Sequence, residues 1–297
     1  MSEVKNPYQN APAATPTGFP PQHQEKQPGS QQQMNPVPVT DNPAYHGSGK
    51  LANRVAVITG GDSGIGQAVA AAFAKEGADV IIAFLNEQED AAKTVQMVEA
   101  AGKRCVTVPC DLRQEAAAQQ VTEIAMREFG HIDVLVNNIA VQYPQTKIED
   151  ISAQQLNDTF ATNIISFFYV TKAVMPHLKT GCSIINTTSV TAYEGSKDLM
   201  DYSATKGAIV SFSRSLALSV APNGIRVNAV APGPVWTPLI PASFDAQKVA
   251  TFGQDVPFAR SAQPFEIAPA YVYLASDDSA FVTGQVIHVN GGKITGS

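Results

Sequence analysis

The sequence predicts an α/β fold, a single domain in which helices cover both faces of a doubly wound parallel sheet of seven strands. Three observations predict it. Short apolar runs alternate with longer helical stretches, the runs are continuous rather than interrupted by polar residues, and a glycine-rich segment follows the first run. Continuous apolar runs are typical of strands buried on both faces. Alternation of strand and helix gives a parallel sheet with helices on both sides.

Seven apolar runs are expected to form the strands. In chain order they are Val55 to Thr59, Val80 to Phe84, Cys105 to Val108, Val134 to Asn137, Ser183 to Thr187, Ile225 to Val230 and Val286 to Val289. Helices are expected at about 64–77, 87–101, 114–129, 153–178, 201–220 and 264–275. Ser152 and Gln155 supply a capping-box start to the fourth helix, and Gly77, Gly102 and Gly130 stand where helices end.

The first 48 residues differ from the rest of the chain. They hold nine of the 20 prolines and seven glutamines, without apolar periodicity. Disorder is expected for residues 1–15. Two alternatives stay open for residues 19–48, a free tail and an irregular arm laid over the folded surface, because Phe19 stands among turn-forming residues. Residues 49–297 are expected to form the folded domain.

Composition and charge exclude several classes of protein. With 297 residues, 44% of them hydrophobic, the chain can bury the core of one large domain. The net charge of -6, with scattered basic residues, argues against a nucleic-acid partner. No segment approaches the ~18 apolar residues of a membrane span, so we expect a cytoplasmic protein without a membrane partner. Cys105, Cys110 and Cys182 are expected to be reduced, and no spacing of cysteine or histidine predicts a metal site.

A glycine-rich run ends the first strand and begins the first helix. It contains Gly60, Asp62, Ser63, Gly64, Ile65 and Gly66. Glycines at this place let the backbone approach a pyrophosphate, and the amides and dipole of the helix start attract it. These residues therefore predict a dinucleotide site and a Rossmann-type fold. With the preceding Thr59, the spacing T-G-x-x-x-G-x-G resembles the fingerprint of the short-chain dehydrogenase/reductase family.

Further motifs extend this resemblance over about residues 51–292. Asp111 and Leu112 resemble the family's adenine-contacting pair, and Asn138 lies in Asn137-Asn138-Ile139-Ala140, where the family usually has N-N-A-G. The resemblance also implies cofactor contacts after the sixth strand from Pro232, Gly233, Val235 and Thr237. It implies a homotetramer built through the helices at 153–178 and 201–220 and the C-terminal strand region. The Pro/Gln-rich arm is similar to that of a bacterial branch described as general oxidoreductases or aldehyde reductases.

Tyr-x-x-x-Lys occurs three times, at Tyr143/Lys147, Tyr193/Lys197 and Tyr202/Lys206. Tyr143 precedes a proline, which disfavours a helix, and Tyr193 and Lys197 flank a turn-like Gly-Ser. Only Tyr202/Lys206 begins a long helical run in which residues four apart share a face. It also follows Ser189, which stands after a strand at the edge where open α/β sheets bind ligands.

The resemblance implies a role for each of these residues. Tyr202 is the acid/base, Ser189 polarises the substrate oxygen, Lys206 holds the nicotinamide ribose, and Asn163, within the fourth helix, supports a proton relay through water. A neighbouring cation such as Lys206 is expected to favour the ionised phenol. The cofactor is NAD or NADP. The second strand ends in Ala83-Phe84-Leu85-Asn86 without an acidic residue, which favours NADP(H), although Glu87 and Glu89 could oppose its phosphate.

The expected function is interconversion of an alcohol with its aldehyde or ketone by an NAD(P)(H)-dependent oxidoreductase. Substrate specificity is expected from residues 234–258, with Trp236, Leu239, Ile240, Phe244 and Phe252, and from Val141 to Pro144 and Tyr193. These mostly apolar residues suggest an uncharged small molecule or, equally, a packed lid. Alternatives are a catalytically silent redox sensor and a docking module in the arm. An enoyl reductase would want tyrosine at position 199, which is leucine.

Overall fold

The computed structural model describes residues 3–4 and 15–295. Of residues 1–15, where disorder is expected, only 3, 4 and 15 are described, in an antiparallel pairing of β1 (Glu3–Val4) with β2 (Thr15–Pro16). The rest of that prediction lies outside the described residues.

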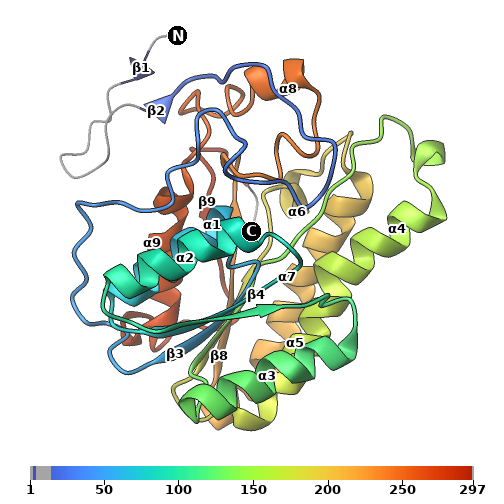
Figure 1. Cartoon of the computed structure of the whole chain (residues 1–297). Coiled ribbons are helices and arrows are strands. Elements are labelled where there is room, and N and C mark those ends of the chain that lie inside the picture. The colour runs from blue at the N-terminus through green and yellow to red at the C-terminus, as the bar shows by residue number, and fades with distance from the viewer. Residues whose placement is uncertain (1–2, 5–14, 296–297) are drawn as a thin grey trace.

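The centre of the molecule is a seven-stranded sheet, as predicted (Figure 1). Its strands are β3 (Val55–Thr59), β4 (Asp79–Phe84), β5 (Cys105–Pro109), β6 (Val134–Asn137), β7 (Ser183–Thr187), β8 (Arg226–Pro232) and β9 (Val286–Val289). They lie in the order β5-β4-β3-β6-β7-β8-β9, and all neighbours are parallel. Strand order therefore reverses between β3 and β6, and a crevice opens at the carboxyl ends of such strands.

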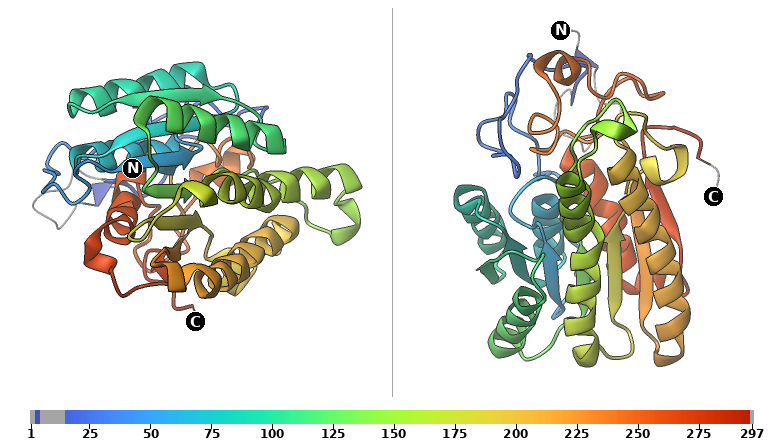
Figure 2. Two further views of the ribbon diagram at one scale, coloured as in Figure 1. Left: turned by 90° about the horizontal axis from the view of Figure 1, so that it is seen from below. Right: turned by 90° about the vertical axis from the view of Figure 1, so that its right-hand side faces the viewer.

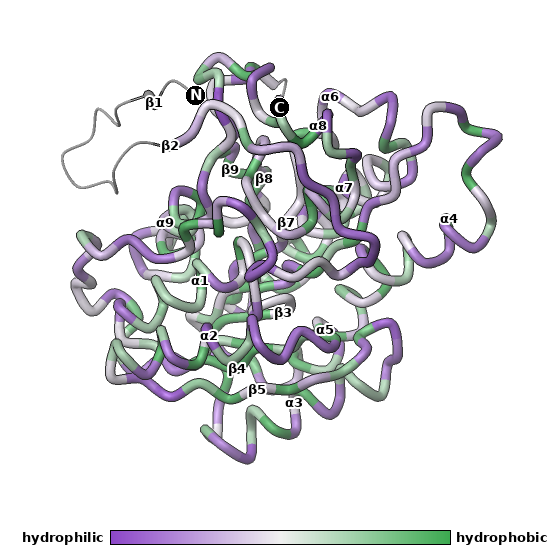
Figure 3. Tube along the Cα trace, turned by 45° about the horizontal axis from the view of Figure 1, so that its top comes forward, coloured by the Kyte–Doolittle hydropathy of each residue, from purple (hydrophilic) through white to green (hydrophobic). Residues whose placement is uncertain are grey.

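Helices cover both faces of the sheet (Figure 2). One face packs against α1 (Gly64–Lys75), α2 (Gln88–Ala100) and α9 (Pro264–Ala275), and the other against α3 (Glu115–Phe129), α5 (Ser166–Val174) and α7 (Met200–Val220). Alternate residues of one strand, such as Val57 and Ile58, enter opposite cores. The apolar residues of β3 and β4 are buried in the interior, whereas the edge strand β5 is only partly buried (Figure 3). Burial on both faces explains why these strands are continuous apolar runs.

The predicted helix 153–178 is interrupted. It consists of α4 (Ala153–Phe160), a π-helical turn (Ala161–Ile165), α5 and a short 3-10 turn (Met175–His177). The Ser152 hydroxyl caps α4 by accepting from the amide of Gln155, as expected. The Gln155 side chain does not complete the capping box, because its amide donates to Tyr143 and Asp201. Periodicity found the helix and missed its one wide turn, which contains Asn163.

The N-terminal arm, defined as residues 17–48, crosses the carboxyl edge of the sheet and then runs down beside α1 to its C-terminal end, where the amide of Ser48 donates to Glu76 at 2.9 Å (Figure 1). The ring of Phe19 stacks on Trp236 with centroids 3.6 Å apart and planes 8° apart. The Trp236 indole donates to the carbonyl of Pro36 at 2.8 Å, and Met34 joins the same apolar cluster. Of the two alternatives for this segment, the structure has the docked arm.

Within the described residues, no helix combines the length and the apolar character needed to cross a membrane.

Candidate active site

A cavity of about 840 Å³ lies at the carboxyl edge of the sheet. This volume is in the upper part of the usual range for small-molecule sites. Most of the predicted site residues line it: Gly60, Asp62, Ser63, Gly64, Ile65, Asp111, Leu112, Asn138, Ser189, Tyr202, Lys206, Pro232, Gly233, Val235 and Thr237. Of the predicted catalytic and cofactor-binding residues, Gly66 and Asn163 are the two that are not on its wall. Residues that lie up to more than 170 positions apart in the chain therefore meet in one cavity, because the strands that they follow all end at the same edge of the sheet.

The glycine turn has the geometry that its sequence predicts. Gly60 and Gly64 have φ of +63° and +52°, which side chains rarely adopt. A Cβ on Gly66 would lie 1.9 Å from the carbonyl oxygen of Gly60, so only glycine permits this close approach. Gly66 thus shapes the turn from behind the cavity wall. Gly64 and Ile65, the first residues of α1, line the cavity beside Gly60, so the turn fits the pyrophosphate of a dinucleotide.

Asn138 joins the glycine turn to the end of β7, which Ser189 follows. Its backbone amide donates to the Thr59 hydroxyl at 2.9 Å, and its side-chain amide donates to the carbonyls of Thr59 and Gly60. The Thr187 hydroxyl donates to the Asn138 side chain at 3.1 Å. Asn138 therefore fixes the distance between the end of β3 and the end of β7 across the strand between them.

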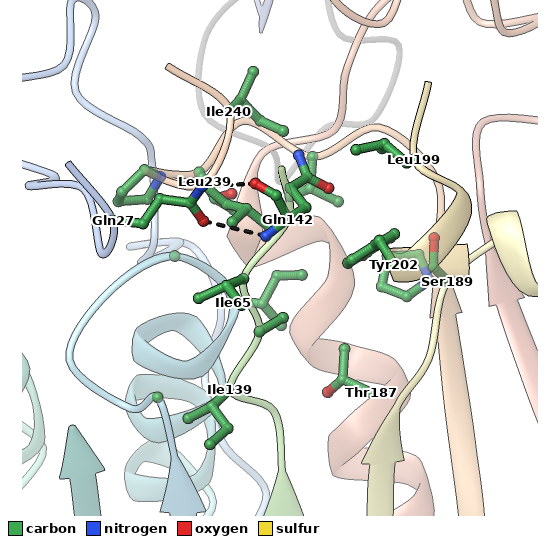
Figure 4. A pocket seen from close by; sticks show the side chains of 18 of the residues that line it. Gln27, Ile65, Ile139, Gln142, Thr187, Ser189, Leu199, Tyr202, Leu239 and Ile240 are labelled. Carbon is green, nitrogen blue, oxygen red and sulfur yellow. Dashed lines mark hydrogen bonds between the residues drawn. The ribbon is translucent and has the colours of Figure 1, made fainter. Parts of the chain in front are cut away.

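Tyr202, Lys206 and Ser189 all line the cavity, and Figure 4 shows Tyr202 beside Ser189. Tyr202 and Lys206 stand one turn apart on α7, and the Lys206 ammonium lies 5.3 Å from the centroid of the Tyr202 ring. It donates to the Thr187 carbonyl at 3.0 Å. Ser189 follows β7 and forms a hydrogen bond with Tyr202. All three are buried, with exposures of 8% for Tyr202, 1% for Lys206 and 7% for Ser189.

Burial dominates the ionisation of this group. It raises the pKa of the Tyr202 phenol to about 12, against a smaller lowering by the Ser189 hydrogen bond. It lowers the pKa of Lys206 to about 7. The expectation that Lys206 holds the phenol in its ionised form is not met in this geometry, because desolvation disfavours both charges and outweighs the attraction between them. The raised pKa favours the protonated, neutral form of the Tyr202 phenol.

The two decoy pairs are separated from this chemistry. Tyr143 lines the cavity, but Lys147 is exposed and outside it. Tyr193 and Lys197 are both absent from the cavity wall. The ring of Tyr193 instead meets His288 edge-on, with centroids 4.6 Å apart. The expectation that Tyr193 contacts substrate is thus wrong, because its turn directs the ring toward β9.

Asn163 is fully buried and acts on a neighbouring loop. Its side-chain oxygen accepts from the Val141 amide at 2.8 Å, and its amide donates to the Val141 carbonyl at 2.9 Å and to the Thr205 hydroxyl at 3.2 Å. This pair of bonds resembles strand pairing and holds the cavity loop that carries Val141. The side chain is committed to these partners, so the structure gives Asn163 a positioning contact rather than a place on the cavity wall.

Carboxylates lie at the end of the cavity where β4 and β5 terminate. Asp62 is buried, and burial, with the nearby Glu87 adding to it, raises its pKa to about 7. Glu87 also lines the cavity, whereas Glu89 does not. Arg113 lines it too, but its guanidinium forms a two-point ion pair with Asp111. Both signs of charge therefore face the region expected to hold the adenosine.

The predicted substrate loop, residues 234–258, supplies part of the opposite wall. Leu239, Ile240, Phe244 and Phe252 line the cavity as expected. Trp236 does not, because it is fully buried beneath Phe19 of the arm. At the cavity mouth, the Lys293 ammonium bridges Glu194 and Asp255 at 3.1 and 3.2 Å, tying the loop to the C-terminal segment.

No pattern in the sequence predicts the arm residues in the cavity wall. Gln27, Pro28 and Gly29 line it, and the Gln31 side chain accepts from the amide of Gly64 at 2.8 Å. Their partners are 33 to 115 positions away in the chain. No local pattern encodes contacts over such separations, so sequence reasoning missed these residues.

Comparison with known proteins agrees with this architecture. The family model described as "Enoyl-(Acyl carrier protein) reductase" matches residues 60–293. An uncharacterized oxidoreductase of Bacillus subtilis is 59% identical over 276 residues, 93% of this chain and 96% of the relative. The NADPH-dependent aldehyde reductase 1 of Arabidopsis thaliana is 49% identical, covering 92% of this chain and 97% of the relative. The glucose and ribitol dehydrogenase of Daucus carota is 48% identical, covering 93% and 97%.

Solved structures share the fold with both types of nicotinamide cofactor. A short chain dehydrogenase from Burkholderia cenocepacia in complex with NADP superposes with a TM-score of 0.77 at 26% identity, covering 82% of this chain and 98% of that chain. A short chain dehydrogenase from Mycobacterium paratuberculosis bound to NAD gives a TM-score of 0.75 at 31% identity, with the same coverage of 82% and 98%.

Proposed function

This chain belongs to the short-chain dehydrogenase/reductase family of NAD(P)-dependent oxidoreductases, and we propose that it interconverts an uncharged aldehyde or ketone with its alcohol, with Tyr202 as the acid/base. The observation that carries the proposal is the convergence of Ser189, Tyr202 and Lys206 in one cavity with the glycine turn. The neutral phenol favours the reductive direction, in which a proton must be donated.

The residues of this chain divide the work as follows. The glycine turn and the start of α1 hold the pyrophosphate, and the nicotinamide, when bound, supplies or accepts the hydride. Ser189 donates a hydrogen bond to the substrate oxygen, which polarises the carbonyl. Tyr202 gives its phenolic proton to that oxygen as negative charge develops there. Lys206 lies beside the phenol and is the nearest source of positive charge for the phenolate that remains.

Asn163 and Asn138 hold the backbone segments that carry the reacting groups. Asn163 fixes the Val141 loop and Asn138 fixes the ends of β3 and β7, so the cofactor side and the acid/base side keep a constant separation. Positioning of this kind matters because a misplacement of about 1 Å between reacting groups can lower a rate roughly a hundredfold.

The cavity wall supports a small, uncharged substrate. Leu239, Ile240, Phe244 and Phe252 offer apolar surface near the catalytic group, and the charges at the mouth are paired with one another. Two relatives are named for aldehydes and for glucose and ribitol. We therefore place the substrate among aldehydes, including those of sugars, and their alcohols.

The rival readings have less support. A silent sensor would not need a buried phenol, hydroxyl and lysine around one point. An enoyl reductase, the activity in the family model's description, would have a tyrosine at position 199. This chain has Leu199 there, on the cavity wall. Three free thiols fit the reducing environment of the cytoplasm, which we propose as its compartment.

An absorbance screen tests the function. NADH and NADPH are each offered with a panel of aldehydes, ketones and sugars, and the loss of the reduced-nicotinamide band is followed. We expect turnover of at least one aldehyde class. If the native protein binds a dinucleotide but turns over no carbonyl or alcohol in the panel, this proposal fails and a catalytically silent redox sensor becomes the better hypothesis.

A further inference from the structure

The arm contacts the walls of the catalytic cavity at more than one place. Other contacts, away from the cavity wall, hold the arm against the domain. Phe19 stacks on Trp236, and the amide of Gln24 donates to the carbonyl of Pro241 at 2.8 Å. Farther along, the amide of Val39 donates to the Gln263 side chain at 2.9 Å. These contacts hold both sides of the segment 27–31, which lies between them.

Gln31 is tied to the glycine turn through every polar group of its side chain. Its oxygen accepts from the Gly64 amide at 2.8 Å, and its amide donates to the Gln67 oxygen at 2.7 Å. Gln67 in turn donates to the carbonyl of Asp62 at 2.8 Å. Gln31 is 5% exposed. A residue from outside the domain thus fixes the first amide of α1, which has no partner within its helix.

Gln27 makes a matching contact on the substrate side. Its amide donates to the Gln142 carbonyl at 2.6 Å, and its oxygen accepts from the Gln142 amide at 3.2 Å. Figure 4 shows this pair across the cavity from Tyr202 and Ser189. Gln142 neighbours Val141, which Asn163 holds from the other side. The loop is therefore clamped between two amide side chains, one from the domain and one from the arm.

We propose that Gln31 and Gln27 are positioning residues of the reaction. Gln31 holds the start of α1 in the conformation that binds the dinucleotide pyrophosphate, and Gln27 holds the 139–143 loop against the substrate. The proposal rests on the proposed function. Glutamine suits both places because one side-chain amide donates and accepts at once: Gln27 does so with the two backbone groups of Gln142, and Gln31 with the Gly64 amide and the Gln67 side chain. Between these two glutamines, Gly29 lets the arm lie close to the backbone of Pro238, since a Cβ on Gly29 would lie 2.7 Å from the Pro238 carbonyl oxygen.

Three Gln→Met variants of the full chain test this. Gln31→Met and Gln27→Met keep the volume and remove the hydrogen bonds, and Gln33→Met, at an exposed position of the same arm, is the control. Dinucleotide Kd is measured by fluorescence titration with NADH and NADPH, without turnover. KM and kcat for a carbonyl substrate are measured at saturating cofactor, and thermal melting is recorded for each variant.

The two variants should differ in kind. Gln31→Met is expected to weaken binding of both dinucleotides roughly tenfold, while kcat at saturation changes little. Gln27→Met is expected to leave the dinucleotide Kd within about twofold and to lower kcat/KM roughly tenfold. Gln33→Met should match the native protein in every measurement.

Two results would overturn the proposal. One is native dinucleotide affinity in Gln31→Met together with native kcat/KM in Gln27→Met. The other is an equal loss of both quantities in both variants in proportion to a lower Tm, which would mark the arm as merely stabilising. If the native protein reduces no carbonyl, the Gln31 binding result still stands by itself. For Gln27, hydrogen exchange of residues 139–143 in the dinucleotide complex then decides, since unchanged exchange in Gln27→Met contradicts its role.

Discussion

At the scale of single residues, the chemistry depends on groups that burial keeps from ionising normally. The Tyr202 phenol and the Lys206 ammonium are both shielded from water. Burial raises the pKa of Tyr202 and lowers that of Lys206, so it favours the neutral form of each. This differs from the simple picture of a cation that ionises a phenol. It keeps Tyr202 in its protonated form and makes the charge of Lys206 sensitive to pH near neutrality.

Tyr202→Phe removes the only proton that the proposed mechanism transfers from the protein. Turnover should fall at least about a thousandfold, in line with loss of general-acid catalysis, while dinucleotide Kd stays near native because the ring is retained. Steady-state rates and a binding titration measure the two effects. Tyr193→Phe, which alters a decoy tyrosine outside the cavity, is the control. Native rates in Tyr202→Phe would refute the assignment.

Lys206→Met should change the pH dependence of stability. Burial lowers the pKa of Lys206 from 10.5 to about 7, so between these values the unfolded chain binds more protons at this site than the folded chain. Stability of the native protein therefore rises with pH across this window. From about pH 7 to about pH 9, its free energy of unfolding should rise by about 2 kcal/mol relative to Lys206→Met.

Urea unfolding followed by circular dichroism at several pH values measures this difference. Lys197→Met, at the exposed lysine of a decoy pair, should keep the native pH profile. Parallel profiles for the native protein and Lys206→Met would mean that the lysine stays protonated throughout the window.

Glu87→Gln tests discrimination against the 2'-phosphate of NADP. Glu87 lines the cavity near Asp62, and its negative charge should repel that phosphate. The ratio of kcat/KM for NADPH to that for NADH should rise roughly three- to tenfold in the variant. Glu89→Gln, an exposed neighbour outside the cavity, serves as the control. An unchanged ratio would place the adenosine ribose away from Glu87.

At the scale of elements, the π-helical turn between α4 and α5 is the feature that joins a helix to the cavity. π-helical turns occur often at functional sites. This one buries the Asn163 amide against both backbone groups of Val141. The Asn163 side chain thereby makes the two hydrogen bonds that a neighbouring strand would make with the backbone of Val141.

Asn163→Ala should leave the amide and carbonyl of Val141 without these partners. We expect a loss of about 1–3 kcal/mol in the free energy of unfolding and a roughly tenfold fall in kcat, because the loop beside the substrate loosens. Chemical denaturation and steady-state kinetics give the two values. Asn157→Ala, at an exposed position of α4, should affect neither. A stable Asn163→Ala protein with native kcat would show that the clamp is dispensable.

At the scale of the whole molecule, apolar side chains remain exposed over α5, α7 and the C-terminal region. Phe168 on α5 is 51% exposed, Leu218 on α7 is 82% exposed, and Phe281 before β9 is fully exposed. Such side chains are unfavourable in water when they gather on helix faces. They agree with the homotetramer that the family resemblance implies, in which these two regions would form two separate interfaces.

Charged substitutions should split that tetramer into dimers. Phe168→Asp is expected to remove the interface at the helices, and Phe281→Asp the one at the C-terminal strand region, with each variant leaving the other interface intact. Light scattering coupled to gel filtration measures the mass. Val37→Asp on the arm, 52% exposed, is the control. A monomeric native protein, or tetramers in both variants, would contradict the proposal.

The sequence by itself determined the sheet, the glycine turn and the choice of Tyr202/Lys206 among three similar pairs. These depend on local patterns: apolar runs, glycine spacing and the four-residue repeat of a helix. The tertiary structure alone decided where the arm lies, that Trp236 and Tyr193 face away from the cavity, and that Asn163 acts on Val141. It also decided the pKa directions at the catalytic group. The reason is physical: contacts between segments 22 to 217 positions apart, and the burial they cause, have no local pattern in the chain.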